Sequence, residues 1–93
     1  MHVALITRYP PRHALDAGRG TAGYSKRLAR ALVAGGCRVT VLADLLDGEQ
    51  PEYEEDGVIV RRVWGSGRHA ISPIVEAIGA IRPDIVHLQH ELF

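Results

Sequence analysis

Residues 21–43 decide the fold. They read TAGYSKRLARALVAGGCRVTVLA, a helical pattern that passes through two glycines into a run rich in β-branched residues. Tyr24, Leu28 and Leu32 recur every four residues, which is the spacing of one face of a helix. We therefore predict an amphipathic helix over 21–34 that turns this row of side chains toward a sheet.

The two glycines separate this helix from a strand. Basic residues such as Lys26 fall outside the apolar row, and we expect them to face water. Gly35 and Gly36 can adopt the positive φ that ends many helices. Residues 37–43 then predict a strand, with Cys37 as a small buried hydrophobe at its start.

Three further apolar runs predict strands. They cover residues 2–7, 58–64 and 85–88, and each is bounded by turn-forming residues. Asp-Gly at 56–57 is a hairpin signal, so residues 52–54 form a candidate short antiparallel arm beside the strand that follows.

A second helix lies between the last two of these runs. Ser72 and Pro73 suit an N-cap and a first helical position, and Ile74 and Ile78 begin an apolar face. Pro83 is expected to end this helix.

Alternating strands and helices predict the α/β class. Right-handed crossovers favour a parallel, Rossmann-like sheet of about four strands in the order 3-2-1-4, flanked by helices. Ligands of such sheets bind beyond the carboxyl ends of the strands, where the strand order reverses. The loops after Thr7 and after Leu88 are therefore the expected functional loops.

Length and composition exclude several classes of protein. The 93 residues suit one small domain or part of one, and the formal net charge of zero gives no support to a nucleic-acid partner. The longest uninterrupted apolar run, residues 3–6, is too short to span a membrane. A single cysteine excludes an internal disulfide and a zinc site built on cysteines. We expect a cytoplasmic protein without a transmembrane segment.

A glycine-rich loop precedes the first helix. Residues 18–23 match G-x-G-x-x-G, with Asp44 at the end of the next strand. This pattern allows backbone N–H groups to approach phosphate, and it leaves open a small module that binds NAD or NADP through Asp44. However, the ten residues 8–17 separate the loop from the first strand, whereas dinucleotide-binding turns follow the strand almost directly.

Five stretches together resemble family 4 (group 1) glycosyltransferases. They are residues 7–11, 20–32, 36–42, 56–63 and 82–91, in the order in which that family has them. The resemblance covers nearly the whole chain and concerns the amino-terminal part of the family's N-terminal Rossmann-like domain.

The resemblance implies a retaining enzyme of the GT-B type. Such enzymes move a sugar from a nucleotide-diphosphate donor to an acceptor without a required metal or other cofactor. Residues 1–93 would form part of the acceptor-side domain, because no E-x7-E carboxylate pair of the donor domain is present. We therefore expect the 93 residues alone to be inactive.

By the same resemblance, the glycine loop approaches the donor phosphates. Gly18, Arg19, Gly20 and Thr21 are the candidate phosphate-binding residues, with Gly20 matching the second glycine of the family's pair. Arg19 stands where the first glycine is usual. It could place a guanidinium near phosphate, or it could be an exposed loop residue.

The remaining candidates lie in the two functional loops. His90 matches the histidine that contacts the donor sugar in the family, although an exposed loop histidine is the alternative. Tyr9 and Arg12 are weaker candidates for contacts with the acceptor. His87 is expected to pack against the sheet, and a metal site with His90 is disfavoured because residues three apart on a strand face opposite ways.

Two other expectations concern surfaces. Arg61 and Arg62 are expected to form a face in contact with water. The strand over 85–88 would be an open edge, which could mediate self-association. A non-catalytic interaction domain therefore remains a third functional class, beside the enzyme and the dinucleotide module.

Overall fold

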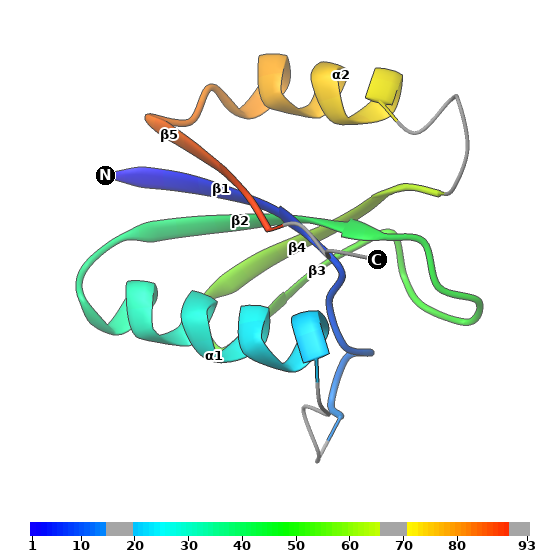
Figure 1. Cartoon of the computed structure of the whole chain (residues 1–93), viewed down its shortest axis with the longest axis horizontal. Helices are drawn as coiled ribbons and strands as arrows, with labels where there is room; N and C mark the ends of the chain where they lie inside the picture. The colour runs from blue at the N-terminus through cyan, green and yellow to red at the C-terminus, as the bar shows by residue number, and fades with distance from the viewer. Residues whose placement is uncertain (15–19, 66–70, 90–93) are drawn as a thin grey trace.

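The computed structural model describes residues 1–14, 20–65 and 71–89, and Figure 1 shows their arrangement. The elements in chain order are β1 His2–Thr7, α1 Gly20–Ala34, β2 Arg38–Asp44, β3 Glu52–Glu55, β4 Val58–Trp64, α2 Ile71–Ile81 and β5 Ile85–Leu88. The sheet forms a middle layer, with α1 on one face and α2 on the other (Figure 1). The fold is therefore the predicted α/β class.

The sheet confirms the predicted strand order and adds one strand. Its order is β3-β4-β2-β1-β5, in which the four parallel strands follow the predicted order 3-2-1-4. The fifth strand is the predicted hairpin arm, β3, which pairs antiparallel with β4 so that Tyr53 lies opposite Val60. The Asp56-Gly57 turn joins these two strands, and both of its residues have positive φ.

Alternation along the strands divides the core between the two faces. The cluster on the α1 face includes Leu5, Val41 and Val60, packed with Ala29 of the helix. The smaller cluster on the α2 face includes Leu42 and two further buried residues, Ile6 and Ala77. Successive strand residues point to opposite faces, so the apolar runs are buried from both sides.

Helix α1 ends as the sequence predicts. Gly35 N–H donates to the carbonyl of Ala31 at 3.0 Å, and Gly36, with φ +96°, donates to Val33 at 3.0 Å. Residues 35–36 thus lead into β2. Cys37 is half-buried against the α1-face cluster, one residue before β2 starts.

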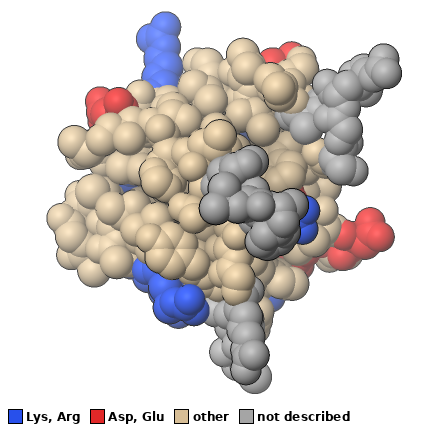
Figure 2. Space-filling model, viewed as in Figure 1, with Lys and Arg blue, Asp and Glu red and all other residues tan. Residues whose placement is uncertain are grey.

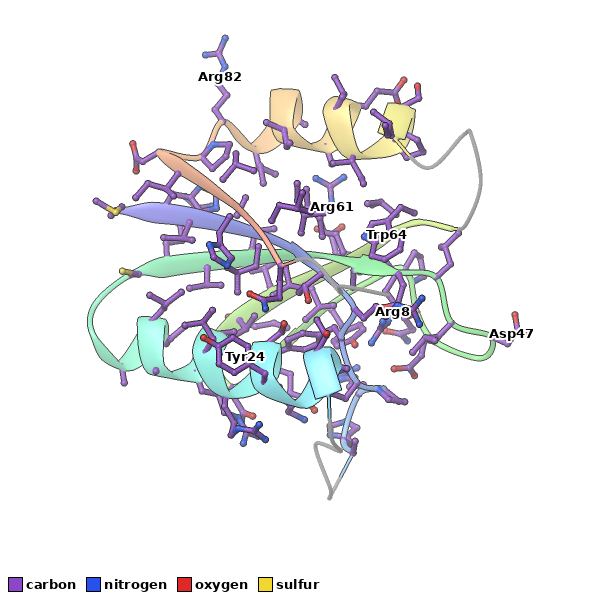
Figure 3. The ribbon with its side chains drawn as sticks, in the orientation of Figure 1. Arg8, Tyr24, Asp47, Arg61, Trp64 and Arg82 are labelled. Atoms are coloured by element: carbon purple, nitrogen blue, oxygen red, sulfur yellow. The ribbon has the colours of Figure 1, made fainter. Side chains whose placement is uncertain are left out.

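The predicted buried face of α1 is wrong in part. Tyr24 is 49% exposed, whereas Ser25, Lys26 and Ala29 are buried. Figure 3 labels Tyr24 on this helix. The small side chains of Ser25 and Ala29 let the helix approach the valine-rich sheet closely, so the buried face is centred on them. Lys26 was expected to face water. Instead, its Nζ lies 3.4 Å from Oε1 of Glu55, which supplies the counter-charge that a buried ammonium needs.

The second helix begins earlier than predicted. It starts at Ile71, so Ser72 and Pro73 lie inside its first turn. Proline is tolerated there because the first N–H groups of a helix have no intrahelical partner. The helix ends at Ile81, two residues before Pro83, close to the predicted end. No helix in the described part of the chain is long and apolar enough to cross a membrane.

Strand β5 is exposed along its length. Its four residues are all exposed, and within the described ranges the strand pairs with β1 alone. The expectation that His87 packs against the sheet is therefore wrong, because an edge strand without a covering helix leaves both of its faces open. The His87 ring lies 3.1 Å from the Gln89 side-chain oxygen.

Candidate functional site

The strand order reverses between β1 and β5, and the chain segments at this edge form the candidate site. Gln89 N–H, just after β5, donates to the carbonyl of Ile6 at 3.0 Å and so holds the two strand ends together. Helix α1 begins at the same edge, since it runs back from the end of β1 toward the start of β2 (Figure 1). This is the edge at which parallel α/β sheets bind ligands.

Gly20 gives α1 its particular start. It has φ +77°, a conformation that residues with a Cβ rarely adopt, and no atom lies within 4 Å of the position of an added Cβ. Glycine is therefore required here by the backbone and not by crowding. The half-buried Thr21 follows. Gly18 and Arg19, the other predicted phosphate-binding residues, lie outside the described residues.

The start of α1 can face an anion. The first N–H groups of a helix lack intrahelical partners, and the aligned peptide dipoles make this end positive. No acidic side chain occupies the first turn of α1, so no carboxylate of that turn competes for the position. These features suit a phosphate group, as the glycine pattern predicts.

A short hydrogen bond joins the end of β1 to α1. The Oγ1 of Thr7 lies 2.6 Å from the Oγ of Ser25, and both side chains are buried. Thr7 also donates to the carbonyl of Arg8 at 3.0 Å. The position of the helix start relative to the strand end is thus fixed by polar contacts as well as by packing.

Residues 8–14, which we call the strap, leave the end of β1 and pass the N-terminal end of α1 (Figure 1). Three carboxylates from other parts of the chain hold its backbone amides. Tyr9 N–H donates to Oδ1 of Asp44 at 3.0 Å, and Arg12 N–H donates to Glu49. A third bond of 2.6 Å runs from the His13 amide to Glu55. Such charge-assisted bonds are stronger than neutral ones.

Arg62 holds the carbonyls of the same segment. Its guanidinium donates to the carbonyls of Tyr9 at 3.2 Å and Pro10 at 2.6 Å. It also donates to the carbonyl of Asp44 at 3.0 Å and to the hydroxyl of Tyr53 at 2.8 Å. The side chain is only 1% exposed. The expectation that Arg62 faces water is therefore wrong.

The strand alternation carried a signal for this burial. Val58, Val60 and Arg62 share one face of β4, and all three are buried. The neighbouring Arg61 points to the other face and lies between the sheet and α2 (Figure 3). The period of two along β4 thus places the two arginines on opposite faces of the sheet, although both were expected to face water.

Tyr9 of the strap packs in one cluster with Tyr53 of β3. The Arg12 guanidinium carbon lies 5.3 Å from the Tyr53 ring centre, within reach of a cation–π contact. Burial raises the pKa of Tyr53 above its usual value. The pKa of Tyr9 is raised strongly, first by burial and then by the charge of Glu55.

The predicted acceptor-side residues therefore differ in accessibility. Arg12 is half-buried on the Tyr53 ring, whereas Tyr9 is only 2% exposed and belongs to the α1-face cluster. An acceptor could reach the Tyr9 ring only if the strap moved. His90, the predicted donor-sugar contact, lies outside the described residues.

Asp44 is engaged with the strap. It accepts the Tyr9 amide, and one of its carboxylate oxygens lies 3.6 Å from Arg62. Both contacts involve the same oxygen, Oδ1, so the strap and Arg62 hold the carboxylate in place. This arrangement gives no support to Asp44 as the ribose ligand of a dinucleotide.

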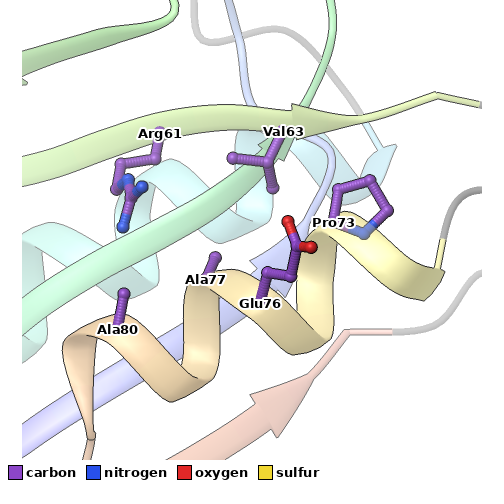
Figure 4. Close-up of a pocket in the computed structure, with 6 residues that line it drawn as sticks. All are labelled: Arg61, Val63, Pro73, Glu76, Ala77 and Ala80. Atoms are coloured by element: carbon purple, nitrogen blue, oxygen red, sulfur yellow. The ribbon is translucent and has the colours of Figure 1, made fainter.

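The opposite face of the sheet has a separate hollow of about 370 Å³ beside α2 (Figure 4). Arg61, Val63, Glu76, Ala77 and two further residues line it. Figure 2 shows one side of the molecule, on which basic and acidic side chains are scattered around the outline. They form no continuous basic surface in that view. The described residues contain no group of three or more His, Cys, Asp or Glu that could hold a metal ion.

Comparison with known families identifies the family of the chain. A sequence model described as the glycosyl transferase 4-like domain matches residues 19–92, which is most of the chain. The chain therefore belongs to this glycosyltransferase family, as its sequence motifs predict. The comparisons with curated proteins and with solved structures gave no match.

Proposed function

We propose that this chain forms part of a retaining glycosyltransferase that moves a sugar from a nucleotide-diphosphate sugar to an acceptor. Family membership supports the reaction class. The conformation of Gly20, at the start of α1 and at the edge where the strand order reverses, supports the position of the donor phosphates.

The chemistry of the proposed step requires an electropositive group near the leaving nucleotide. The bond between the sugar and the diphosphate breaks, and negative charge develops on the diphosphate oxygens. Backbone N–H groups aimed at that position stabilise the charge without having to reorganise. In this proposal Gly18, Arg19, Gly20 and Thr21 face the phosphates.

The other candidates surround the sugar and the acceptor. His90 would hydrogen-bond hydroxyl groups of the donor sugar, since a neutral imidazole both donates and accepts. Arg12 would contribute to the acceptor side from the strap. Tyr9 would act through the packing of the strap, given its burial.

Two glycines of α1 provide a matched test. Gly20 and Gly36 lie at opposite ends of the helix, both have positive φ, and neither has an atom within 4 Å of an added Cβ. Gly20→Ala and Gly36→Ala should therefore impose similar backbone strain, of the order of 1–2 kcal/mol. Each would be made in the reading frame that contains this sequence, expressed to its stop codon.

We expect Gly20→Ala to lower the rate of sugar transfer by at least about tenfold. Removing one hydrogen-bond donor to a developing anion typically costs about 100- to 1,000-fold, and this substitution only displaces the donors. Gly36→Ala should leave the rate near that of the unaltered protein, because it lies at the far end of the helix. Transfer rates are measured with a panel of nucleotide-diphosphate sugars. Equal rates for the two variants would contradict the placement of the phosphates.

A further inference from the structure

The connection between β2 and β4 is unusual for parallel neighbours. Such strands are normally joined through a helix that covers the sheet, but described residues 45–57 contain only the strand β3 and turns. The face of β3 and β4 beside α1 therefore lacks the cover of a crossover helix. The strap takes this place, since Tyr9 packs in one cluster with Tyr53, Val58 and Val60.

We propose that Arg62 is the positioning residue of the strap and, through the strap, of the acceptor side of the transferase site. The second half of this proposal rests on the proposed function. Pro10 and Pro11 have no N–H group, so the strap cannot join the sheet as a regular strand. The Arg62 guanidinium, from β4, replaces the missing backbone hydrogen bonds of a sheet by donating to the carbonyls of Tyr9 and Pro10.

Arginine is suited to this position by its geometry. Its planar fork carries five N–H donors, and here two nitrogens serve three carbonyls and the Tyr53 hydroxyl. The carboxylates of Asp44 and Glu49 lie 3.6 and 3.9 Å from it and balance its charge. Lysine would keep the charge but not the fork, so it should hold the strap only in part.

The backbone of the strap also requires external support. His13 has φ 63°, a conformation that is rare for residues other than glycine. Such a conformation persists where surrounding contacts fix it. The contacts in question are the Glu55 bond to the His13 amide, together with the Arg62 bonds at the other end of the strap.

The first test measures amide hydrogen exchange by NMR in the 93-residue chain. Arg62→Met should speed exchange at the Tyr9, Arg12 and His13 amides by at least about tenfold, while amides of β1 and β2 change less. Arg62→Lys should give an intermediate increase. Arg61→Met, on the opposite face of β4, is the matched control and should leave the strap amides unchanged.

Exchange at the strap amides that is the same in Arg62→Met as in Arg61→Met would overturn the proposal. If Arg62→Met does not fold, Arg62→Lys carries the test, and strap amides that exchange no faster than in the unaltered chain would again overturn it. This experiment needs no sugar transfer. Its result is therefore independent of whether the proposed function is correct.

The second test uses the active transferase, once a donor and an acceptor are known. Arg62→Lys should raise the KM for the acceptor several-fold and change the KM for the donor much less, because the phosphates approach α1 and not the strap. Equal changes in the two KM values, or a change in kcat alone, would refute the acceptor-side role. Absence of transfer by the unaltered protein would instead count against the proposed function.

Discussion

Replacing Arg62 should destabilise the fold far more than replacing its neighbour Arg61. Arg62→Met removes a guanidinium that is 1% exposed and leaves the carbonyls of Tyr9 and Pro10 without their donor. It also leaves the carboxylates beside the guanidinium without a balancing charge. Breaking a buried ion pair from one side costs about 3–5 kcal/mol.

The individual bonds set an upper bound on this cost. Each hydrogen bond to a charged group contributes about 1.5–3 kcal/mol, but four bonds of one side chain are not additive. We therefore expect the lower figure of about 3–5 kcal/mol, a large share of the roughly 5–15 kcal/mol that stabilises a typical domain. Among the residues that the structure describes, Arg61 has one ion pair, at 3.9 Å to Glu52, and Arg61→Met should cost no more than about 1 kcal/mol.

The assay is urea unfolding followed by the fluorescence of Trp64, the single tryptophan, and by circular dichroism. The two probes should give coincident transitions, and the free energies of unfolding are compared at equal m-values. A loss for Arg62→Met no larger than that for Arg61→Met would refute the reasoning that Arg62 is a buried structural cation.

Three further predictions concern Thr7, Tyr9 and strand β5. Thr7→Val should cost about 1–3 kcal/mol in urea unfolding, because the buried Ser25 hydroxyl loses its partner; a neutral result would contradict this. The raised pKa of Tyr9 means that stability is fully present below about pH 10, where an unfolded tyrosine ionises, and is lost as the pH rises above it. Tyr9→Phe should therefore unfold less readily than the unaltered chain as the pH is raised, relative to its own stability at pH 7, and an identical pH dependence would argue against a buried Tyr9 hydroxyl. Strand β5 exposes Val86 at 45%, so the 93-residue chain should self-associate in sedimentation experiments, and Val86→Lys should reduce this; a monodisperse monomer would contradict the prediction.

The parts of the fold that the sequence predicts are those set by local patterns. Apolar runs identify β1, β2, β4 and β5, and the Asp-Gly turn identifies β3. The two glycines after residue 34 mark the end of α1. Each signal lies within a few residues of the element that it specifies, so a short window of sequence is enough to find it.

The parts that it does not predict depend on contacts between distant segments. The burial of Lys26 depends on Glu55, and the role of Arg62 depends on a strap more than fifty residues earlier. Periodicity along β4 does place Arg62 with Val60, but charge alone suggests exposure, and only the location of the strap resolves that conflict. Exposure of Tyr24 likewise follows from the closer approach allowed by Ser25 and Ala29.

The candidate site divides in the same way. The edge at which ligands bind follows from the strand order, and the glycine at the start of α1 follows from its motif. The three carboxylates that hold the strap amides could not be predicted, because Asp44, Glu49 and Glu55 come from separate segments. An acidic residue at the end of a strand or in a turn carries no sequence signal that it binds a particular backbone group.

The most direct test of the proposed transferase is the stereochemistry of its reaction. The reading frame that contains this sequence is expressed to its stop codon, incubated with nucleotide-diphosphate sugars and candidate acceptors, and its products are followed by NMR. We predict release of a nucleoside diphosphate that depends on the acceptor, with the product sugar in the same anomeric configuration as the donor. Inverted configuration would contradict the retaining mechanism, and saturable NAD or NADP binding without any sugar transfer would contradict the account as a whole.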